Sequence, residues 1–402
     1  MPEKLRNRKI VVVNQASNYL TVGLCNAFAD KFEQVALVTG NIHVQGEELS
    51  TVVQIESINK WIEKPAGRKF LSYIRACASI AWLLLFKFRK HEVFFVSLPP
   101  MAYLLTAVLP NRCSILVWDV YPDVFKITGM KETHPIYRIW GWLNGIAFRK
   151  AYRVFTIGNR MADLMKKYVR SDKILITPIW SIFQSNKKVA KYKNPFVLEH
   201  NLFGKFVVQY SGNIGLTHRV EAMVELAEVM KDYDDILFQI IGRGPRMPFL
   251  QALVEDKGLP NCQFLPFQSD EMFPYSLSAA DIGVVILDEI TSKGSVPSKS
   301  YNLMSYGIPG LYIASKDSEL HDYAVKYEHA KCVNQKNMDE AVEFILALKN
   351  SVDLQRKYSE NSINASKNYR RTNADKIVSC YLNGDSVITN PKKSSIMSED
   401  AA

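Results

Sequence analysis

The length, composition and charge of this chain limit the kinds of protein it can be. It has 402 residues, of which 48% are apolar and 22% are charged, a balance typical of a globular protein. A chain of this length exceeds one ordinary core and fits two α/β domains of roughly 180 residues each. The six cysteines lie far apart in the sequence, which excludes a disulfide framework or a paired zinc site and indicates reduced, cytosolic thiols.

The net charge of +10 is distributed unevenly along the chain. Residues 1–182 contain 25 Lys and Arg against 13 Asp and Glu, a balance of +12, and the remainder contains 25 against 27, a balance of −2. The two halves therefore have different partners. A basic half suits nucleic acid or an anionic lipid surface.

The first half repeats short apolar runs separated by helical patterns. The runs are continuous and not alternating, as in parallel strands that are buried on both faces. The predicted strands are Ile10–Asn14, Val35–Thr39, Val93–Ser97, Ile115–Trp118, Arg153–Ile157 and Ile174–Thr177. The run at Ile10 follows a basic N-terminus and is too short for a signal peptide, so it predicts the first strand.

The second half begins again with the same pattern after a polar, lysine-rich stretch. We expect a first domain at 1–184, a connector at 185–204, a second domain at 205–382 whose last helix packs back on the first, and a disordered tail at 383–402. The strands expected in the second domain are Phe206–Tyr210, Ile236–Ile241, Gln263–Leu265, Ile282–Ile286 and Gly310–Ile313. The fold class is therefore α/β, with two doubly wound, Rossmann-like domains that face a central cleft, where such sheets bind ligands at the carboxyl ends of their strands.

Three loops of the second half carry the candidate ligand-binding residues. Two are glycine turns between a strand and a helix, Tyr210–Gly215 and Ile241–Pro245, and either a diphosphate or a tight turn alone accounts for such glycines. The third loop, Gly294–Pro309, contains Ser298 as a candidate helix cap, with Lys299 and Asn302 on one helical face. A lysine at a helix start favours a bound anion, although a solvated side chain is the alternative.

The series YSGNIG, IIGRGP, SAADIGVVIL and VPSKSYNLMSYGIPG resembles the nucleotide-sugar domain of GT-B glycosyltransferases. It is most similar to the retaining family 4, in particular to the fucosaminyltransferase-like enzymes of bacterial O-antigen, capsule and exopolysaccharide synthesis. The resemblance covers essentially the whole chain and is strongest from Phe206 to Ile313.

The resemblance implies a role for each matching residue. Donor binding is expected of residues from four loops: Gly212, Asn213, Gly215, His218, Arg219, Gly242, Arg243, Gly244, Phe267, Gln268, Ser298 and Asn302. Lys299 is expected to be catalytic at the donor phosphates. Many relatives have Arg at the position of Asn213 and Glu at the positions of Gly294 and Asn302, so we expect Lys299, Arg219 and Arg243 to meet the phosphate charge here.

The acceptor side is expected in the basic first half. Asp119 follows a strand at the position where relatives carry an acidic residue or a histidine near the transferred sugar, with Asp123 as the second candidate. A turn or cap role is the alternative for Asp119. Ala76–Phe86 is an apolar run too short to span a bilayer, so it predicts either a helix lying on the membrane surface or a core helix.

The resemblance implies a cytoplasmic enzyme held peripherally on the inner face of the plasma membrane. Its partners would be a nucleotide-sugar donor, with UDP favoured, and a lipid-linked glycan acceptor, without nucleic acid. No cofactor or metal is expected, because the Asp-x-Asp spacing at Asp232–Asp235 lies between a helix and a strand, where a solvated turn is favoured.

Two other functions share this pattern. Nucleotide-sugar 2-epimerases have the same two-domain fold but act on a soluble substrate, and a non-catalytic sugar- or lipid-binding partner would need no reactive groups. A dinucleotide-dependent oxidoreductase is disfavoured, because Asn14–Asn18 after the first strand lacks the G-x-G-x-x-G turn.

Overall fold

The computed structural model divides the chain into two compact units. The structure describes residues 5–62, 66–96, 98–184, 188–215, 219–290 and 292–384. Unit 1 contains residues 1–122, 132–179 and 371–402, and unit 2 contains residues 123–131 and 180–370. The tail predicted to be disordered lies outside the described residues from position 385 onward.

Unit 1 is built on a parallel sheet of seven strands in the order β5-β3-β1-β6-β7-β8-β9. The strands are β1 (Leu5–Val13), β3 (Phe32–Thr39), β5 (Val53–Ser57), β6 (Glu92–Val96), β7 (Cys113–Val117), β8 (Arg153–Thr156) and β9 (Ile174–Ile176), and β2 (Ala16–Ser17) pairs with β4 (Asn41–Ile42). All six strands predicted in this half are confirmed. The structure adds the edge strand β5, which has mostly exposed residues and therefore no continuous apolar signal.

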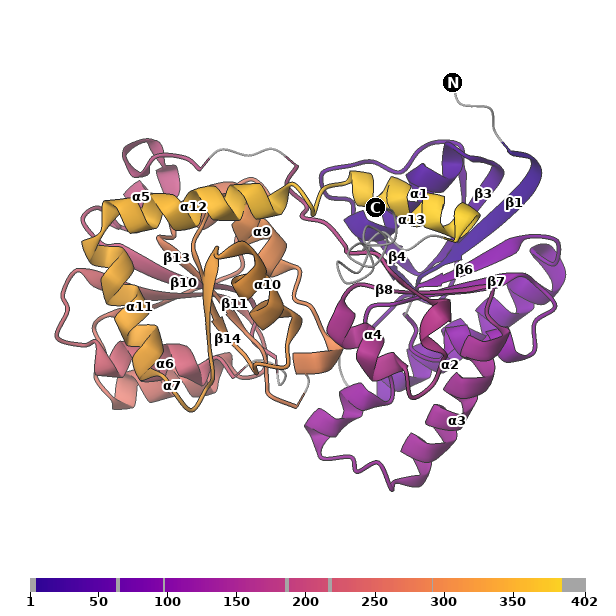
Figure 1. Cartoon of the computed structure of the whole chain (residues 1–402), viewed down its shortest axis with the longest axis horizontal. Helices are drawn as coiled ribbons and strands as arrows, with labels where there is room; N and C mark the ends of the chain where they lie inside the picture. The colour runs from indigo at the N-terminus through magenta and orange to yellow at the C-terminus, as the bar shows by residue number, and fades with distance from the viewer. Residues whose placement is uncertain are drawn as a thin grey trace, which may run out of the picture. The chain divides into compact units, whose positions relative to one another are not determined.

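Helices cover both faces of this sheet (Figure 1). They are α1 (Tyr19–Ala29), α2 (Ala66–Trp82) with a π-helical turn at Leu83–Lys87, α3 (Pro135–Lys150), α4 (Asn159–Met165) and α13 (Thr372–Asn383), with short 3₁₀ turns at Ala102–Ala107, Asp123–Thr128 and Ser171–Lys173. In Figure 1, α1 and α13 lie above the sheet, and α2, α3 and α4 lie below it. The predicted return of the last helix is present, because the Tyr381 ring of α13 packs against Phe28 and Phe94.

Unit 2 contains a parallel sheet of six strands in the order β12-β11-β10-β13-β14-β15. The strands are β10 (Phe206–Asn213), β11 (Ile236–Arg243), β12 (Cys262–Leu265), β13 (Ile282–Ile286), β14 (Gly310–Ile313) and β15 (Ala330–Val333). The five strands predicted here are confirmed, and the structure adds β15, which the sequence analysis does not predict. Alternate residues of β13 and β14 face opposite layers of core, which explains why their apolar runs are continuous.

Two layers of helix enclose this sheet. The helices are α5 (Pro195–Glu199), α6 (Glu221–Val229), α7 (Met247–Asp256), α8 (Phe273–Ala279), α9 (Lys299–Ser305), α10 (Glu319–Tyr327), α11 (Asp339–Asn350) and α12 (Val352–Ser366), with 3₁₀ turns at Lys191–Lys193 and Ser292–Gly294. Helices α6, α7 and α11 contribute to one core cluster, and α8, α9 and α10 contribute to the other. The chain is thus the expected pair of doubly wound α/β units.

The connector predicted at 185–204 is wrong for its second part. Pro195–Glu199 forms α5, and Phe196, Val197 and Leu202 are fully buried in a core cluster with β11 and α8 residues. The lysines and Pro195 made this stretch look like an exposed linker, but Pro195 occupies the first turn of the helix, where proline is favoured. Asn194 caps this helix by accepting from the Phe196 amide.

Candidate functional site

Two glycine turns of unit 2 meet where β10 and β11 end. Gly212 pairs with Gly242 across the strands, and both have positive φ values, 152° and 154°. A Cβ atom added to Gly242 would lie 1.9 Å from the Gly212 carbonyl oxygen, and one added to Gly244 would lie 2.1 Å from the Ile214 carbonyl oxygen. Close packing of the two backbones therefore requires glycine at Gly242 and Gly244 independently of any ligand.

The Lys299 amine lies directly against the first of these turns. A Cβ atom on Gly212 would approach Lys299 Nζ to 2.8 Å, so Gly212 leaves the space that the amine occupies. Lys299 Nζ donates to the Tyr210 hydroxyl at 2.9 Å and lies 4.1 Å from the centre of the Tyr210 ring. The two loops that the sequence separates by almost ninety residues thus form one site.

Lys299 has no acidic partner among the described residues. Its side chain is partly buried, its recorded polar contact is a phenol, and no ion pair includes it. Burial lowers the pKa of the Lys299 amine to about 7. A partly desolvated amine without a counter-charge is stabilised in its charged form by a bound anion.

Tyr210 is the residue of this site that the sequence analysis missed. Its side chain is fully buried, its hydroxyl donates to the Asn213 carbonyl at 2.7 Å, and burial raises its pKa. The phenol oxygen therefore accepts from Lys299 and holds the amine beside the Gly212 turn. The only sequence signal was its place at the head of the YSGNIG segment.

Ser298 and Asn302 lie on either side of Lys299 along the chain. Ser298 occupies the cap position of α9, but its side chain makes no cap hydrogen bond, so the predicted capping role is wrong. Its hydroxyl is left exposed at the start of the helix. The side-chain oxygen Oδ1 of Asn302 accepts from the buried Ser181 hydroxyl at 2.8 Å, a positioning contact that the sequence gave no reason to expect.

The loops after β11 and β12 also come together. The Arg243 guanidinium lies 5.4 Å from the centre of the Phe267 ring, which is 46% exposed. These residues are adjacent because Ile241 pairs with Leu265 at the ends of the two strands. Gln268 is half-buried and donates to the Pro266 carbonyl at 2.8 Å. An exposed ring with a cation beside it can stack against a planar aromatic ligand.

The remaining residues predicted to bind the donor have fewer contacts that support a binding role. Arg219 forms an ion pair with Glu225 at 2.8 Å, with both side chains well exposed, and such pairs are readily exchanged for other partners. Asn213 is exposed beside Gly215, where a Cβ atom would meet the Asn213 amide nitrogen at 3.3 Å. His218 lies outside the described residues.

The two acidic candidates of the acceptor side differ in their surroundings. Asp119 lies in a bend just after β7 of unit 1, and desolvation by the protein around it raises the pKa of its carboxyl to about 6. Asp123 is buried, groups with unit 2 and forms an ion pair with Lys126 at 3.0 Å. Of the two, Asp119 has the more available carboxylate.

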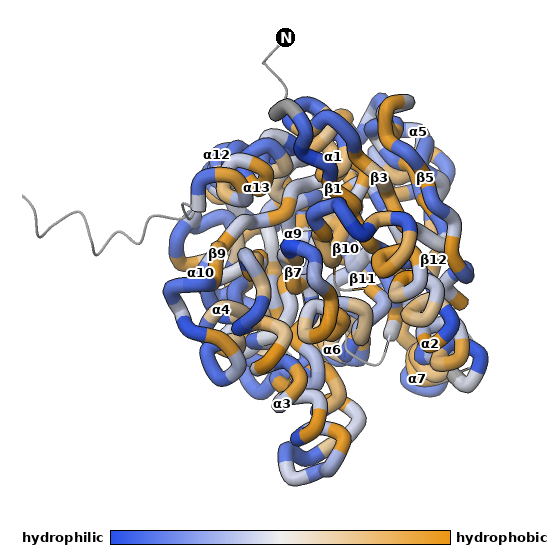
Figure 2. The backbone as a smooth tube through the Cα atoms, turned by 90° about the vertical axis from the view of Figure 1, so that its right-hand side faces the viewer, coloured by the Kyte–Doolittle hydropathy of each residue, from blue (hydrophilic) through white to orange (hydrophobic). Residues whose placement is uncertain are grey.

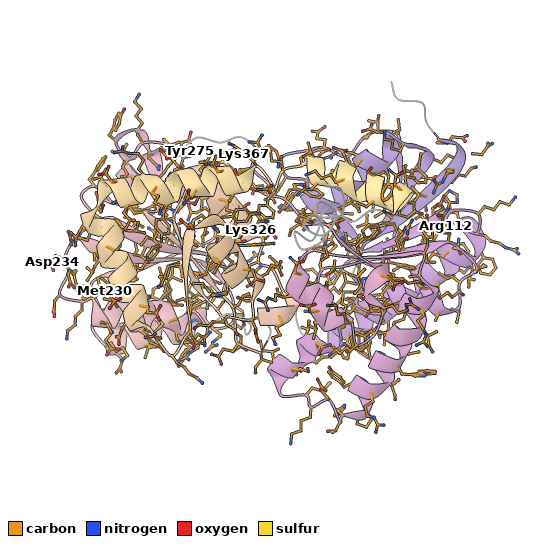
Figure 3. All side chains as sticks on the ribbon, viewed as in Figure 1. Arg112, Met230, Asp234, Tyr275, Lys326 and Lys367 are labelled. Atoms are coloured by element: carbon orange, nitrogen blue, oxygen red, sulfur yellow. The ribbon has the colours of Figure 1, made fainter. Side chains whose placement is uncertain are left out.

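Within the described part of the chain, no group of three or more His, Cys, Asp or Glu residues could hold a metal ion. The Asp232–Asp235 segment is an exposed turn between α6 and β11, as predicted, and Asp235 forms an ion pair with Lys349 at 2.8 Å. Figure 3 labels Asp234 at the surface of unit 2. This turn precedes β11, whereas the glycine loops follow the strands.

Helix α2 is longer than the apolar run Ala76–Phe86 that the sequence analysis considered. Gly67–Lys87 forms one helical segment of 21 residues that is long and apolar enough to cross a membrane, and 28% of its apolar window is buried. The uninterrupted apolar run Ala76–Phe86 is too short for this by itself, but the residues before Ala76 continue the same helix. Length and composition alone do not separate a span from a helix on a surface.

The sequence of unit 2 matches that of known proteins. Residues 197–365 match the family model described as glycosyl transferases group 1. A protein of Escherichia coli (strain K12) named as a colanic acid biosynthesis glycosyl transferase, WcaI, is 27% identical over 220 residues, which are 52% of this chain and 53% of that protein. The chain thus matches about half the length of this relative.

Solved structures match almost the whole chain. The structure of WaaG, a glycosyltransferase involved in lipopolysaccharide biosynthesis, aligns with a TM-score of 0.67 at 12% identity and covers 94% of this chain and 100% of its own. The structure of Anabaena Alr3699/HepE in complex with UDP-glucose aligns with a TM-score of 0.68 at 12% identity, with the same coverage. The protein has the GT-B fold of glycosyltransferases. Its second unit carries the sequence pattern of the group 1 glycosyl transferases.

Replacement of Lys299 by alanine should weaken nucleotide-sugar binding by roughly 10- to 150-fold, the contribution of a hydrogen bond to a charged group. The measurement is the shift in melting temperature at increasing concentrations of UDP-glucose. Lys293→Ala is the matched control, because Lys293 lies in the same loop but pairs with Asp317 at 2.8 Å. An undiminished shift in Lys299→Ala would remove this residue from the site.

Donor affinity should also depend on pH through the same amine. Below pH 7 Lys299 carries its charge before the donor arrives, whereas above pH 7 the amine must first gain a proton, because its pKa is lowered to about 7. Affinity should therefore fall by up to about tenfold per unit as pH rises above 7. Titration calorimetry between pH 6 and 9 measures this, and Lys299→Met should give a flat profile over this range.

Proposed function

We propose that this protein is a retaining glycosyltransferase that moves a sugar from a UDP-sugar to a lipid-linked or oligosaccharide acceptor in bacterial surface polysaccharide biosynthesis. The observation that carries the proposal is the unpaired Lys299 amine held by Tyr210 against the Gly212 turn. The group 1 family match and the name of WcaI support this class of activity.

The proposed chemistry follows from the charge at this site. As the bond between the anomeric carbon and the donor phosphate breaks, positive charge develops on the sugar and negative charge on the leaving diphosphate. Lys299 and the amide groups of the Gly212 loop would stabilise that negative charge. The acceptor hydroxyl oxygen forms the new bond to the anomeric carbon, and its proton passes to the leaving phosphate oxygen.

The nucleotide is proposed to bind across the loops after β11 and β12. Arg243 and the exposed Phe267 ring form a surface on which a base can stack. Alr3699/HepE, which has the same fold, is named as a complex with UDP-glucose. A uracil base over Phe267 with its diphosphate towards Lys299 is the arrangement we favour.

Asp119 is proposed to act on the acceptor side. With a pKa raised to about 6, its carboxyl is largely ionised at neutral pH and protonated in mild acid. An ionised carboxylate there can accept a hydrogen bond from the incoming hydroxyl or stabilise positive charge on the sugar. Asp123, which is paired with Lys126, is the less favoured candidate.

Asp119→Asn should lower kcat about 10²- to 10³-fold, as expected for the loss of a charge that stabilises the transition state, while the donor-induced melting shift stays unchanged. In the wild type, kcat/KM should decline as pH falls below about 6, because protonation removes the carboxylate charge. Asp123→Asn is the comparison. A greater loss in Asp123→Asn, with its fold intact, would reverse the assignment.

The acceptor is proposed to lie at the cytoplasmic face of a membrane, to which α2 and α3 bind. The outer side of α2 exposes Phe70, Ile74, Trp82, Leu85 and Phe86 at helical spacing. Helix α3, on the same side of the sheet (Figure 1), exposes Ile136, Ile139 and Trp142. Figure 2 shows how hydrophobic and hydrophilic stretches alternate along both helices.

Basic residues border this apolar surface. Arg68, Arg75, Lys87, Arg89 and Lys90 all lie on α2 or just after it and are exposed. An apolar face with a cationic border favours anionic lipid over neutral lipid, with each well-placed basic residue contributing about 1 kcal/mol. This supports peripheral association of unit 1 with the membrane.

The double variant Trp82→Ser/Phe86→Ser should bind vesicles of phosphatidylcholine and phosphatidylglycerol at least roughly tenfold more weakly, because burial of one such side chain contributes about 1.5–3 kcal/mol. Vesicle co-sedimentation measures this binding. Val325→Ser, which removes an equally exposed side chain from α10 of unit 2, is the control. Equal binding by all three proteins would show that α2 does not contact lipid.

The competing functions predict different products. An epimerase of this fold would convert a UDP-sugar without any acceptor, and a non-catalytic binding partner would keep its function in Lys299→Ala and Asp119→Ala. Incubation of the protein with labelled UDP-sugars, with and without a membrane extract, separates them. Label transferred only in the presence of the extract supports the glycosyltransferase.

A further inference from the structure

A cavity lies in unit 1, between the segment after β5 and helix α2. It has a volume of about 390 Å³ and is lined by Asn59, Lys60, Arg68, Leu71, Ser72 and Arg75, among others. Asn59 and Lys60 follow β5, and the other four belong to the first half of α2. None of the residues assigned to donor binding contributes to it.

Gln15 connects the two segments that line this cavity, the one after β5 and helix α2. This buried side chain follows β1, and its amide donates to the Asn59 carbonyl at 3.0 Å and to the Ser72 carbonyl at 3.3 Å. One residue thereby joins the ends of β1 and β5 to α2. The cavity lies at the carboxyl edge of the sheet, where open α/β sheets bind ligands.

The charges at this cavity are of one sign. Arg68, Arg75 and Lys60 line it, and none has an acidic partner among the described residues. Arg68 and Arg75 are seven residues apart, two turns of helix, so their side chains leave the same face of α2. Guanidinium groups bind phosphate oxygens in pairs, which makes a phosphate group the ligand that this charge pattern suits best.

An apolar surface begins at the edge of the same cavity. Leu71 lines it and is 43% exposed, and Phe70 and Ile74 on the adjacent side of α2 are 59% and 43% exposed. A ligand that filled the cavity with a phosphate group could thus lay a hydrocarbon chain along α2. Neither a free phosphate nor a neutral sugar would use both features.

We propose that this cavity binds the phosphate group of an amphiphile, the lipid-linked acceptor, with Arg68 and Arg75 contacting the phosphate and the hydrocarbon chain following the exposed side of α2. This rests on the proposed function and names the chemical class of its acceptor. Asp119 lies near the same part of α2. Burial, together with the charge of Asp119, raises the pKa of Tyr73, the residue next to Ser72.

The test uses octyl phosphate as a soluble probe, with inorganic phosphate and octyl glucoside as comparisons that lack the chain or the charge. Binding to the full-length protein is measured by titration calorimetry below the micelle concentration. Octyl phosphate should bind at least tenfold more tightly than either comparison. Equal binding of octyl phosphate and inorganic phosphate would overturn the proposal, because the chain would then add nothing.

Matched variants locate the binding. Arg68→Gln/Arg75→Gln should lose at least tenfold in octyl phosphate affinity, whereas Arg89→Gln/Lys90→Gln, which removes the same charge beyond the far end of the helix, should change it less than twofold. On phosphatidylglycerol vesicles the two variants should lose binding equally, since both lack two positive charges. Equal loss of octyl phosphate affinity in both would show diffuse attraction only and would overturn the proposal.

A failure here is distinguishable from a failure of the proposed function. The UDP-glucose melting shift of Arg68→Gln/Arg75→Gln should equal that of the wild type, which also shows that the variant is folded. If the wild type binds UDP-glucose and transfers sugar but does not bind octyl phosphate, the cavity proposal alone is wrong. If it neither binds the donor nor transfers sugar, the glycosyltransferase proposal itself is wrong.

Discussion

The contact between the Lys299 amine, the Tyr210 phenol and the backbone of Gly212 is the interaction on which the proposed donor site depends. It brings a cation into a partly buried position without a carboxylate, a costly arrangement unless an anion completes it. The glycines of the adjacent β11 loop serve a different purpose, because they let two parallel backbones end in contact. The site thus combines two closely packed glycine turns with one poorly solvated amine, that of Lys299.

The two units differ in charge, and each has a surface that suits a different kind of ligand. Unit 2 places the Gly212 turn and Lys299 at the carboxyl edge of one sheet, a geometry suited to a nucleoside diphosphate. Unit 1 has the excess of basic residues, the exposed apolar side of α2 and the cationic cavity beneath it. A water-soluble donor and an amphiphilic acceptor would each meet the surface that suits their chemistry.

The sequence predicted the sheets well because most strands are buried on both faces and therefore appear as continuous apolar runs. It missed β5, whose exposed residues break the run, and it mistook α5 for a linker, because lysines and a proline surround a few buried side chains. Lys299 was found from its motif, but its partner Tyr210 is 89 residues away in the chain, a contact that local patterns do not encode. The exposure of α2 was equally hidden, because an apolar helix has the same composition in a core and on a surface.

The most direct test of the account is a crystal structure of the protein with UDP-glucose. The account predicts that a diphosphate oxygen lies within hydrogen-bond distance of Lys299 Nζ and that the Gly212 loop amides face the same group. It further predicts the uracil ring beside Phe267. A nucleotide bound elsewhere, with Lys299 still contacting only Tyr210, would contradict it.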